Sequence, residues 1–180
     1  PTSCGKAVDR MEIRIDSPDP FKQVGEILTK GMNVMDGYYN NPEASNTVLS
    51  PDGWLHTGDL GVLDPDGYLY IKGRSKSLIL GPSGQNIYPE EIEDLLNAQP
   101  YIAESLVIER EGKLVALVYP DAEAMKQNKI SREALLKIIH ETRKQINQQI
   151  PAYSQIARIE IHDEEFEKTP KRSIKRFLYQ

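Results

Sequence analysis

The pattern of apolar residues changes near residue 74, and this change restricts the possible folds more than any other feature of the sequence. Before it, short runs alternate between apolar and polar side chains, as at Met11, Ile13 and Ile15, which is the period of a β-strand. After it, the runs fit helices and strands in turn. The chain has 180 residues, enough for a β-rich subdomain followed by an α+β domain of about one hundred residues.

Turn-forming segments separate the predicted strands of the first part. They are Ser-Pro-Asp-Pro at residues 17–20, Ser-Pro-Asp-Gly at 50–53 and Asp-Pro-Asp-Gly at 64–67. Proline presets one backbone dihedral angle of a turn, and glycine supplies a positive one. We therefore expect short strands at residues 25–29 and 68–71, in addition to the strand around Ile13.

The second part predicts helices that begin at Pro89 and after Ser131. Proline suits the first position of a helix, and a serine side chain can cap one. The second helix ends before Pro151, because the residue before a proline is pushed out of the helical region. Its apolar stripe comprises Leu135, Ile139, Ile146 and Ile150. Strands are expected at residues 103–108, 114–119 and 156–161, the first two forming a hairpin around Glu111-Gly112-Lys113.

The composition is that of a globular protein and excludes several classes of function. Hydrophobic residues make up 39% of the chain and charged residues 27%. The net charge is -5, so no overall positive field would recruit nucleic acid. Cys4 is the only cysteine and the histidines are scattered, so we expect no disulfide and no metal site. No apolar run approaches the roughly 20 residues that span a bilayer, which makes the cytoplasm the default prediction and leaves peripheral membrane contact open.

The two most specific motifs lie between residues 52 and 74. Residues 52–61 read Asp-Gly-Trp-Leu-His-Thr-Gly-Asp-Leu-Gly, and residues 66–74 read Asp-Gly-Tyr-Leu-Tyr-Ile-Lys-Gly-Arg. Upstream, Gly-Glu-Ile begins at residue 25 and Gly-Tyr-Tyr-Asn-Asn-Pro at residue 37. In this order the motifs resemble the adenylate-forming superfamily, which includes acyl-CoA synthetases, peptide-synthetase adenylation domains and luciferases. The resemblance covers essentially the whole chain, and several motifs in the right order argue against coincidence.

The resemblance implies a division into domains. Residues 1–74 would form a β-rich, distorted barrel-like subdomain at the end of the large AMP-binding domain. Residues 75–77 would be the hinge, with Lys76 as its central residue. Residues 78–180 would form a mobile C-terminal α+β domain with a central sheet flanked by helices. The family's phosphate-binding loop and acyl pocket would belong to an N-terminal part that precedes this sequence.

Asp59 and Arg74 are the candidate nucleotide-binding residues. A carboxylate on a glycine-flanked turn can accept hydrogen bonds from both vicinal hydroxyls of a ribose, and the resemblance implies this role for Asp59. It makes Arg74 the second ribose contact, whose planar donor fork suits the recognition of oxygen atoms. The simpler alternatives are that Asp59 only caps its turn and that Arg74 only forms a surface salt bridge.

The segment Gly-Pro-Ser-Gly-Gln at residues 81–85 resembles the loop that lines the family's pantetheine tunnel. Ser83, Gly84 and Gln85 are therefore candidate CoA contacts, with glycine allowing the backbone to pass close to a thiol substrate. Taken alone, the segment predicts only a hairpin turn.

The last motif departs from the family pattern. Members usually carry a Gly-Lys-Ile whose lysine binds the acyl carboxylate and the phosphate during adenylation. Here Ser173 stands in the lysine position and Arg172 in the glycine position. Lys171 and Lys175 flank the serine, and in an extended segment all three side chains would project from one face. We expect one of these lysines, Lys171 slightly before Lys175, to supply the catalytic charge; the alternative is a basic tail in solvent.

Taken as a whole, the resemblance predicts part of an acid–thiol ligase. The complete enzyme would use ATP and Mg²⁺ to convert a carboxylic acid to an acyl-adenylate, which CoA would then attack. The motif at residues 37–42 and the Ile-Lys-Arg ending resemble ligases of long-chain fatty acids. This chain alone is expected to be inactive. Two alternatives stay open: an adenylation domain that loads a carrier protein, and a non-catalytic interaction module that has lost the lysine.

Overall fold

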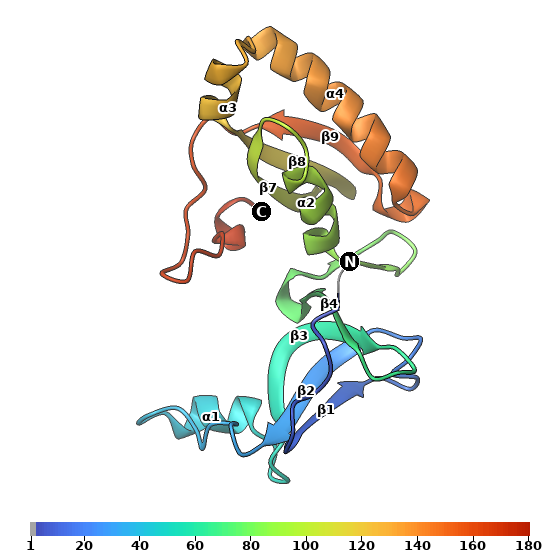
Figure 1. The fold of residues 1–180 in the computed structure, drawn as a ribbon, viewed down its shortest axis with the longest axis vertical. Helices are drawn as coiled ribbons and strands as arrows, with labels where there is room; N and C mark the ends of the chain where they lie inside the picture. The colour runs from blue at the N-terminus through green and yellow to red at the C-terminus, as the bar shows by residue number, and fades with distance from the viewer. Residues whose placement is uncertain (1–2) are drawn as a thin grey trace. The chain divides into compact units, whose positions relative to one another are not determined.

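The computed structural model describes residues 3–180. The chain divides into two compact units, Pro1–Ser77 and Leu78–Gln180 (Figure 1), and each unit has its own hydrophobic core. The first unit is built mainly from strands and the second from a sheet with helices, which confirms the predicted α+β class. The assignment of functional domains to residues 1–74 and 78–180 stays a prediction.

Unit 1 contains one antiparallel sheet whose strands follow their order in the sequence. They are β1 (Met11–Asp16), β2 (Gly25–Gly31), β3 (Leu55–Leu63) and β4 (Leu69–Arg74), with the short helix α1 (Pro42–Val48) before β3. The core is small and centres on Ile15, Ile27 and Leu69. The prediction of a barrel-like subdomain is corrected, because within residues 3–180 the sheet is open and β1 does not pair with β4. Four strands are too few to close around a filled interior.

Four turns of the same form recur along both units. In each, the amide of the first residue donates to the carbonyl of the fifth, and the amide of the fourth donates to the carbonyl of the first. Proline is always second, and the fourth residue always has a positive φ, between 63° and 88°. This is a three-residue hairpin loop whose last residue adopts the left-handed conformation. The four turns occupy residues 50–54, 64–68, 81–85 and 169–173, and their fourth residues are Gly53, Gly67, Gly84 and Arg172.

Unit 2 is organised around a three-stranded mixed sheet. β7 (Ile102–Arg110) pairs antiparallel with β8 (Lys113–Pro120), and β9 (Ile156–Ile161) pairs parallel with β8. Glu111 and Gly112 join β7 to β8 with φ angles of 54° and 72°, which is the two-residue hairpin turn favoured by strand twist. A second, smaller pair is formed by β5 (Ile79–Leu80) and β6 (Asn86–Ile87), around residues 81–85.

The two longer helices of unit 2 begin where the sequence predicts, and α4 also ends there. α2 (Pro89–Asn97) begins with its proline, and α4 (Arg132–Gln149) is capped by Ser131, whose side chain accepts a hydrogen bond from the amide of Ala134. Pro151 follows the end of α4. Two short helices were not predicted, α1 and α3 (Ala122–Gln127). Each is capped by a side chain, Asn41 for α1 and Asp121 for α3, but neither buries a residue, so neither carries the apolar stripe that periodicity detects.

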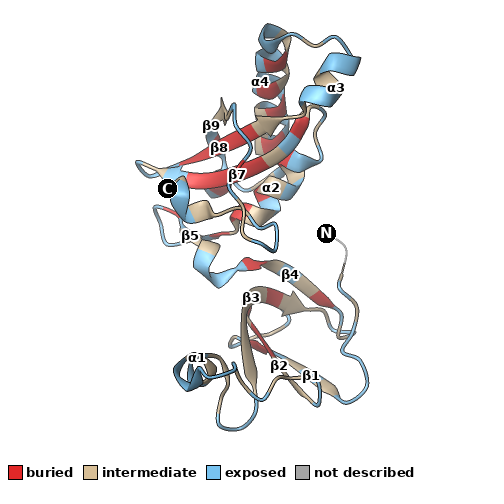
Figure 2. Ribbon diagram, turned by 90° about the vertical axis from the view of Figure 1, so that its left-hand side faces the viewer, coloured by how far each residue is buried: buried red, intermediate tan, exposed pale blue. Residues whose placement is uncertain are grey.

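The mixed sheet is covered on both faces, as the buried colour along β7 and β8 in Figure 2 shows. On one face, residues of α2 and α4 such as Leu96 and Ile146 pack against Val107, Ala116 and Val118 of the sheet. On the other face, Leu106, Ile108, Val115 and Leu117 contact Phe166 with Ile174 and Tyr179 at the rim. The C-terminal segment therefore completes the core. Burial of both faces explains why these strands read as continuous apolar runs.

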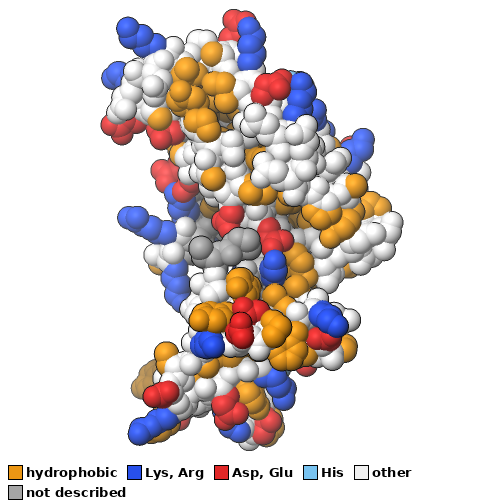
Figure 3. Space-filling model, turned by 45° about the vertical axis from the view of Figure 1, so that its right-hand side comes forward, with side chains coloured by type: hydrophobic (Ala, Val, Ile, Leu, Met, Phe, Trp, Pro, Cys, Tyr) orange, Lys and Arg blue, Asp and Glu red, His pale blue; other side chains and the backbone are white. Residues whose placement is uncertain are grey.

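Charged side chains of both signs lie on the surface of the molecule (Figure 3). Acidic and basic side chains are interspersed on the face drawn in Figure 3. Among residues 3–180, no helix is both long and apolar enough to cross a bilayer. Within the same range, no group of three or more His, Cys, Asp or Glu side chains is arranged to hold a metal ion.

Candidate nucleotide and thiol sites

Asp59 lies within β3 and not on a turn as predicted, in an irregular part of the strand that is held by its own side chains and by β2. Thr57 Oγ1 donates to the carbonyl of Ile27 on β2 at 2.7 Å and accepts from the amide of Asp59 at 3.1 Å. The register of β2 and β3 shifts in this region, between Glu26 and Leu28 of β2. The irregularity leaves room for a bulged β3, and the threonine hydroxyl fixes the course of the backbone up to Asp59.

Glu26 is a second anchor of this part of β3, and we did not predict its role from the sequence. Its Oε1 accepts from the amide of Gly58 at 2.9 Å, and its Oε2 lies 2.9 Å from His56 Nδ1. His56 Nε2 in turn lies 3.0 Å from Ser50 Oγ. The only sequence signal was the position of Glu26 in the Gly-Glu-Ile motif. The pairing of β2 with β3 was needed to show which segment of the chain this carboxylate supports.

Asp59 and Arg74 meet at the edge of the sheet. They are register partners on β3 and β4, and Arg74 Nη1 donates to Asp59 Oδ1 at 2.6 Å. Their side chains are 31% and 58% exposed, so both remain accessible to a ligand. The surface salt bridge considered as an alternative for Arg74 is therefore present. It places a carboxylate and a guanidinium side by side, a combination that presents both acceptors and donors to a pair of hydroxyl groups.

Lys76 lies at the end of unit 1. It is exposed and occupies the middle of a single 3₁₀ turn, Ser75–Ser77, that follows β4. The boundary between the two compact units falls directly after this turn. Its role as a hinge stays a prediction.

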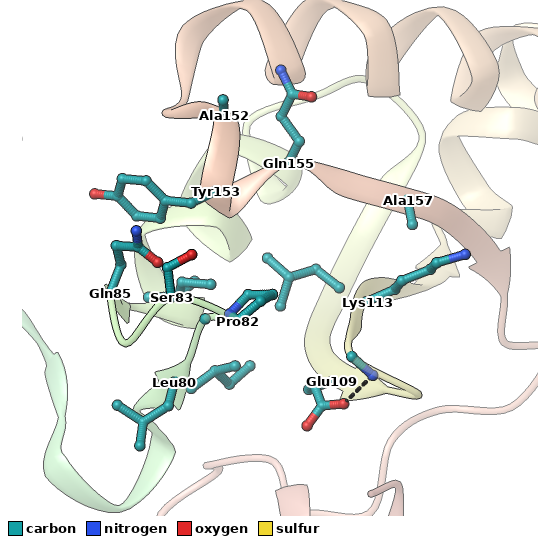
Figure 4. A pocket seen from close by; sticks show the side chains of 15 residues that line it. Leu80, Pro82, Ser83, Gln85, Glu109, Lys113, Ala152, Tyr153, Gln155 and Ala157 are labelled. Atoms are coloured by element: carbon teal, nitrogen blue, oxygen red, sulfur yellow. Dashed lines mark hydrogen bonds between the residues drawn. The ribbon is translucent and has the colours of Figure 1, made fainter.

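Two of the three candidate CoA residues line a pocket in unit 2 (Figure 4). Ser83 and Gln85 contribute to its wall, and the pocket has a volume of about 460 Å³. Lys113 at the start of β8 lies across the pocket from them, Tyr153 lies beside them, and Gln155, just before β9, contributes to the wall as well. Within residues 3–180, Gln85 Oε1 is buried and accepts no hydrogen bond.

The third candidate, Gly84, is not among the residues that line this pocket. It is the fourth residue of its turn, with a φ of 79°. Glycine is favoured there because a side chain makes this backbone conformation costly. Its place in the sequence thus has a conformational reason that is independent of any ligand.

The segment around Ser173 is a turn, so the condition under which Lys171, Ser173 and Lys175 would share one face, an extended segment, is not met. Lys168 pairs with Ile174, and the intervening residues form the fourth of the recurring turns. Arg172 has a φ of 63°, the conformation in which glycine is ordinarily found. Lys171 therefore sits at the tip and does not share a face with Ser173.

The two candidate lysines have different surroundings. Lys175 Nζ lies 3.1 Å from Glu167 Oε2, and its amide donates to the carbonyl of Glu167, so it closes the hairpin. Lys171 is exposed and forms no ion pair with any residue in the described range. Ser173 is exposed as well, and its amide donates to Thr169 Oγ1 at 3.3 Å.

Comparison with known proteins identifies the class to which the chain belongs. Residues 76–179 match the family model of the AMP-binding enzyme C-terminal domain. Because the match spans more than half of the sequence, the chain belongs to this family. Indoleacetate–CoA ligase of Aromatoleum aromaticum is 44% identical over 64% of the chain and 24% of its own length. A 2-succinylbenzoate–CoA ligase of Bacillus cereus is 38% identical over 77% of the chain and 29% of its own length.

Solved structures of such enzymes match the whole fold. O-succinylbenzoate coenzyme A synthetase of Bacillus subtilis, in complex with its acyl-adenylate intermediate, superposes with a TM-score of 0.77 at 30% identity. The match covers 99% of this chain and 35% of that one. Other structures of the same enzyme contain AMP, or ATP and a magnesium ion. The chain thus spans about a quarter to a third of the length of the relatives it matches.

Proposed function

We propose that this chain is the C-terminal part of an acid–thiol ligase. In the first half-reaction, a carboxylate attacks the α-phosphorus of ATP, which gives an acyl-adenylate and releases pyrophosphate. In the second, the thiol of CoA attacks the acyl carbon, which gives a thioester and releases AMP. The observation that carries the proposal is the match over 99% of the chain to a synthetase in complex with its acyl-adenylate.

Asp59 and Arg74 would bind the ribose of the nucleotide. Two hydroxyl groups on adjacent carbons can each donate to a carboxylate oxygen, and a charged acceptor makes such hydrogen bonds stronger. Arg74 already orients Asp59 through the 2.6 Å contact. Both side chains are partly exposed, so they can exchange part of their present hydration for the ribose. The adjacent hydrogen bonds of Glu26 and Thr57 keep the part of β3 that carries Asp59 in one conformation.

Lys171 would supply positive charge to the acyl carboxylate and the α-phosphate in place of the lysine that Ser173 replaces. Charge accumulates on the phosphate oxygens in the transition state, so a positioned cation lowers the barrier. Lys171 suits the role because its ammonium group is exposed and unpaired among the described residues. Lys175 is the second choice, since it would have to leave Glu167 first.

Ser83, Gln85 and the pocket beside them would receive part of CoA. The pantetheine arm of CoA contains two amides, and their N–H groups could satisfy the buried Gln85 Oε1, which otherwise lacks a partner in the described structure. An unsatisfied buried acceptor is costly, so a ligand that pairs with it gains affinity. The exposed Tyr153 offers an apolar surface to the methylene groups of the same arm.

Magnesium and the missing part of the active site complete the scheme. Mg²⁺ is usually held by one or two carboxylates together with the substrate phosphates. Since the described residues contain no metal-binding cluster, we assign no residue of this chain to the ion. When bound, it would neutralise phosphate charge.

Residues 78–180 would pivot at Lys76 to present first the 169–173 hairpin and then the 81–85 loop to an N-terminal part of the enzyme.

Two classes of acid substrate are proposed. The sequence motifs favour a long-chain fatty acid, whereas the relatives quoted above are named for indoleacetate and 2-succinylbenzoate, which are aromatic. The family's acyl pocket lies upstream of this region, so the two classes must be separated by experiment. Loading of a carrier protein is the less favoured alternative, since those relatives are named as CoA ligases.

The test uses the complete ligase that contains this chain. ATP–pyrophosphate exchange is measured with a panel of long-chain and aromatic acids, followed by thioester formation with CoA. We expect exchange with one class of acid, and a loss of about 100-fold or more in Lys171→Ala. Lys175→Ala is the matched control and should lose far less. The isolated 180-residue chain should show neither reaction.

Three results would count against the proposal. Absence of exchange with every acid in the panel would refute the ligase assignment. Full activity in both alanine variants would refute the role of the neighbouring lysines. A gain of activity in Ser173→Lys together with an inactive wild type would show instead that the natural chain is a non-catalytic module.

A further inference from the structure

One buried ion-pair network fastens the C-terminal segment to the rest of unit 2. Arg176 Nη1 donates to the carbonyl of Val107 on β7 at 2.7 Å, and Nη2 donates to Glu93 Oε2 on α2 at 2.9 Å. The side chains of Arg176 and Glu93 are only 16% and 12% exposed. A single guanidinium group therefore joins helix α2, the edge strand β7 and the tail.

Glu93 is held from two sides as well. Its Oε1 accepts from the amide of Val107 at 2.6 Å, in addition to the contacts with Arg176. Burial raises the pKa of the Glu93 carboxyl above its ordinary value, while the hydrogen bond and charge of Arg176 act in the opposite direction. A lysine at position 176 would keep the charge but could not form the same set of bonds, because it lacks the planar fork of arginine.

The network sits next to the hairpin that carries Lys171. Arg176 follows Ile174, which pairs with Lys168 and packs at the rim of the second core face. Lys168, at the other end of the hairpin, forms an ion pair with Glu104 on β7 at 2.6 Å. Both ends of the hairpin are thus fixed to the same strand, and only its tip is free.

We propose that Arg176, acting through Glu93 and Val107, is a positioning residue for Lys171 in the adenylation step. The inference rests on the proposed function. Arg176 is largely buried and occupied by protein partners, so it acts on the reaction through the hairpin and not by touching substrate. A displacement of about 1 Å at a reacting group can cost about 100-fold in rate, so the anchoring of the hairpin decides whether Lys171 reaches the phosphate.

Arg176→Lys in the complete ligase tests the idea by comparing the two half-reactions. We expect adenylation, measured by ATP–pyrophosphate exchange, to fall about tenfold or more. Thioester formation from supplied acyl-adenylate should stay within about twofold, because the 81–85 loop does not depend on this hairpin and α2 remains held by the buried Ile92 and Leu96. Equal losses in both half-reactions, or no loss, would overturn the inference.

Arg132→Lys is the matched control. Arg132 forms a two-pronged ion pair with Asp163 at the start of the same tail, at 2.6 Å and 3.0 Å, but both side chains are more than half exposed. The same substitution at this exposed pair should leave both half-reactions unchanged. A second variant, Glu93→Gln, removes the nearer of the two carboxylates that face Arg176, the other being Glu90 at 3.7 Å, and should repeat the selective loss.

A readout on the 180-residue chain separates this inference from the proposed function. Trypsin cleaves after Lys171 and Arg172, and a firmly held hairpin resists it. We expect trypsin to cut Arg176→Lys at these two sites about five times faster or more, because the cleavage rate follows the fraction of molecules in which the hairpin is open. The cleavage rate of Arg132→Lys should equal that of the wild type. Equal cleavage rates in the wild type and Arg176→Lys would refute the positioning role even if the ligase is active. An inactive wild-type ligase would refute the proposed function alone.

Discussion

At the scale of single residues, Glu93 combines two opposing effects on its own ionisation. Removal from water disfavours the carboxylate, and the neighbouring guanidinium of Arg176 favours it. Burial is the larger effect, so the pKa of Glu93 stands above its ordinary value. The folded state therefore binds a proton at Glu93 more tightly than the unfolded chain does.

The raised pKa of Glu93 predicts a sign for the dependence of stability on pH. Between the ordinary glutamate pKa of about 4.3 and the higher value in the folded chain, the native state binds more protons than the unfolded state. The contribution of Glu93 to the free energy of unfolding is then fully present below about pH 4.3 and is lost as pH rises through the folded pKa. This contribution is measured by urea unfolding of the wild type and of Glu93→Gln at several pH values. The free energy of unfolding of the wild type, relative to that of the variant, should fall as pH rises. A rise with pH would mean that the effect of Arg176 on the pKa of Glu93 outweighs the effect of burial.

The two flanking lysines show what single-residue arguments from sequence can and cannot reach. The replacement at Ser173 and the presence of Lys171 and Lys175 nearby follow from the sequence. The sequence does not show which of the two lysines is unpaired, because the partner of Lys175 is Glu167, on the other arm of the hairpin. Such a partner is set by the turn between the two arms.

At the scale of elements, the recurring five-residue turn explains one success and one failure of prediction. The turns at residues 50–54 and 64–68 were predicted from proline and glycine, and the structure confirms them. The turn at residues 169–173 was not predicted; its fourth residue is Arg172 and not glycine. There the cross-strand hydrogen bonds and the docking of Ile174 outweigh the cost of the left-handed conformation.

This cost predicts that Arg172→Gly stabilises the chain. A side chain in the left-handed region costs about 1–2 kcal/mol, and the extra freedom of glycine in the unfolded chain returns about 0.5–1 kcal/mol of that. We expect a net gain of about 0.5–1 kcal/mol in the free energy of unfolding, measured with urea and circular dichroism. Lys171→Gly is the control: its φ is not positive, so it should destabilise. A loss in Arg172→Gly would show that the arginine side chain makes a stabilising contact.

At the scale of the whole molecule, the two compact units have separate cores of different size. Unit 1 centres on Ile15, Ile27 and Leu69. Unit 2 has two apolar clusters, one on each face of its mixed sheet. Trp54, the single tryptophan, belongs to unit 1, whereas the longer helices α2 and α4 belong to unit 2. The two units can therefore be followed by different spectroscopic signals.

We predict that damage to one core leaves the other unit intact. Ile146 is fully buried, and Ile146→Ala should cost about 2–5 kcal/mol through lost burial and a cavity. The urea midpoint of the helical circular dichroism signal should fall, while the midpoint of Trp54 fluorescence stays unchanged. In Ile27→Ala, the midpoint of Trp54 fluorescence should fall while the midpoint of the helical circular dichroism signal stays unchanged. A common shift of both signals would show that the units unfold as one cooperative structure.

The sequence by itself determined the local features of this protein. The strand and helix periods, the proline and glycine turns, the cap at Ser131 and the stop at Pro151 all follow from short-range sterics and hydrogen bonding, which depend on neighbouring residues only. The ordered motifs also identified the family. The tertiary structure alone decided that the sheet of unit 1 is open, that Glu26 supports the part of β3 that carries Asp59, and that Arg176 enters a buried network with Glu93. These contacts join segments distant in the chain, and their energies depend on burial and partner geometry that no local pattern encodes.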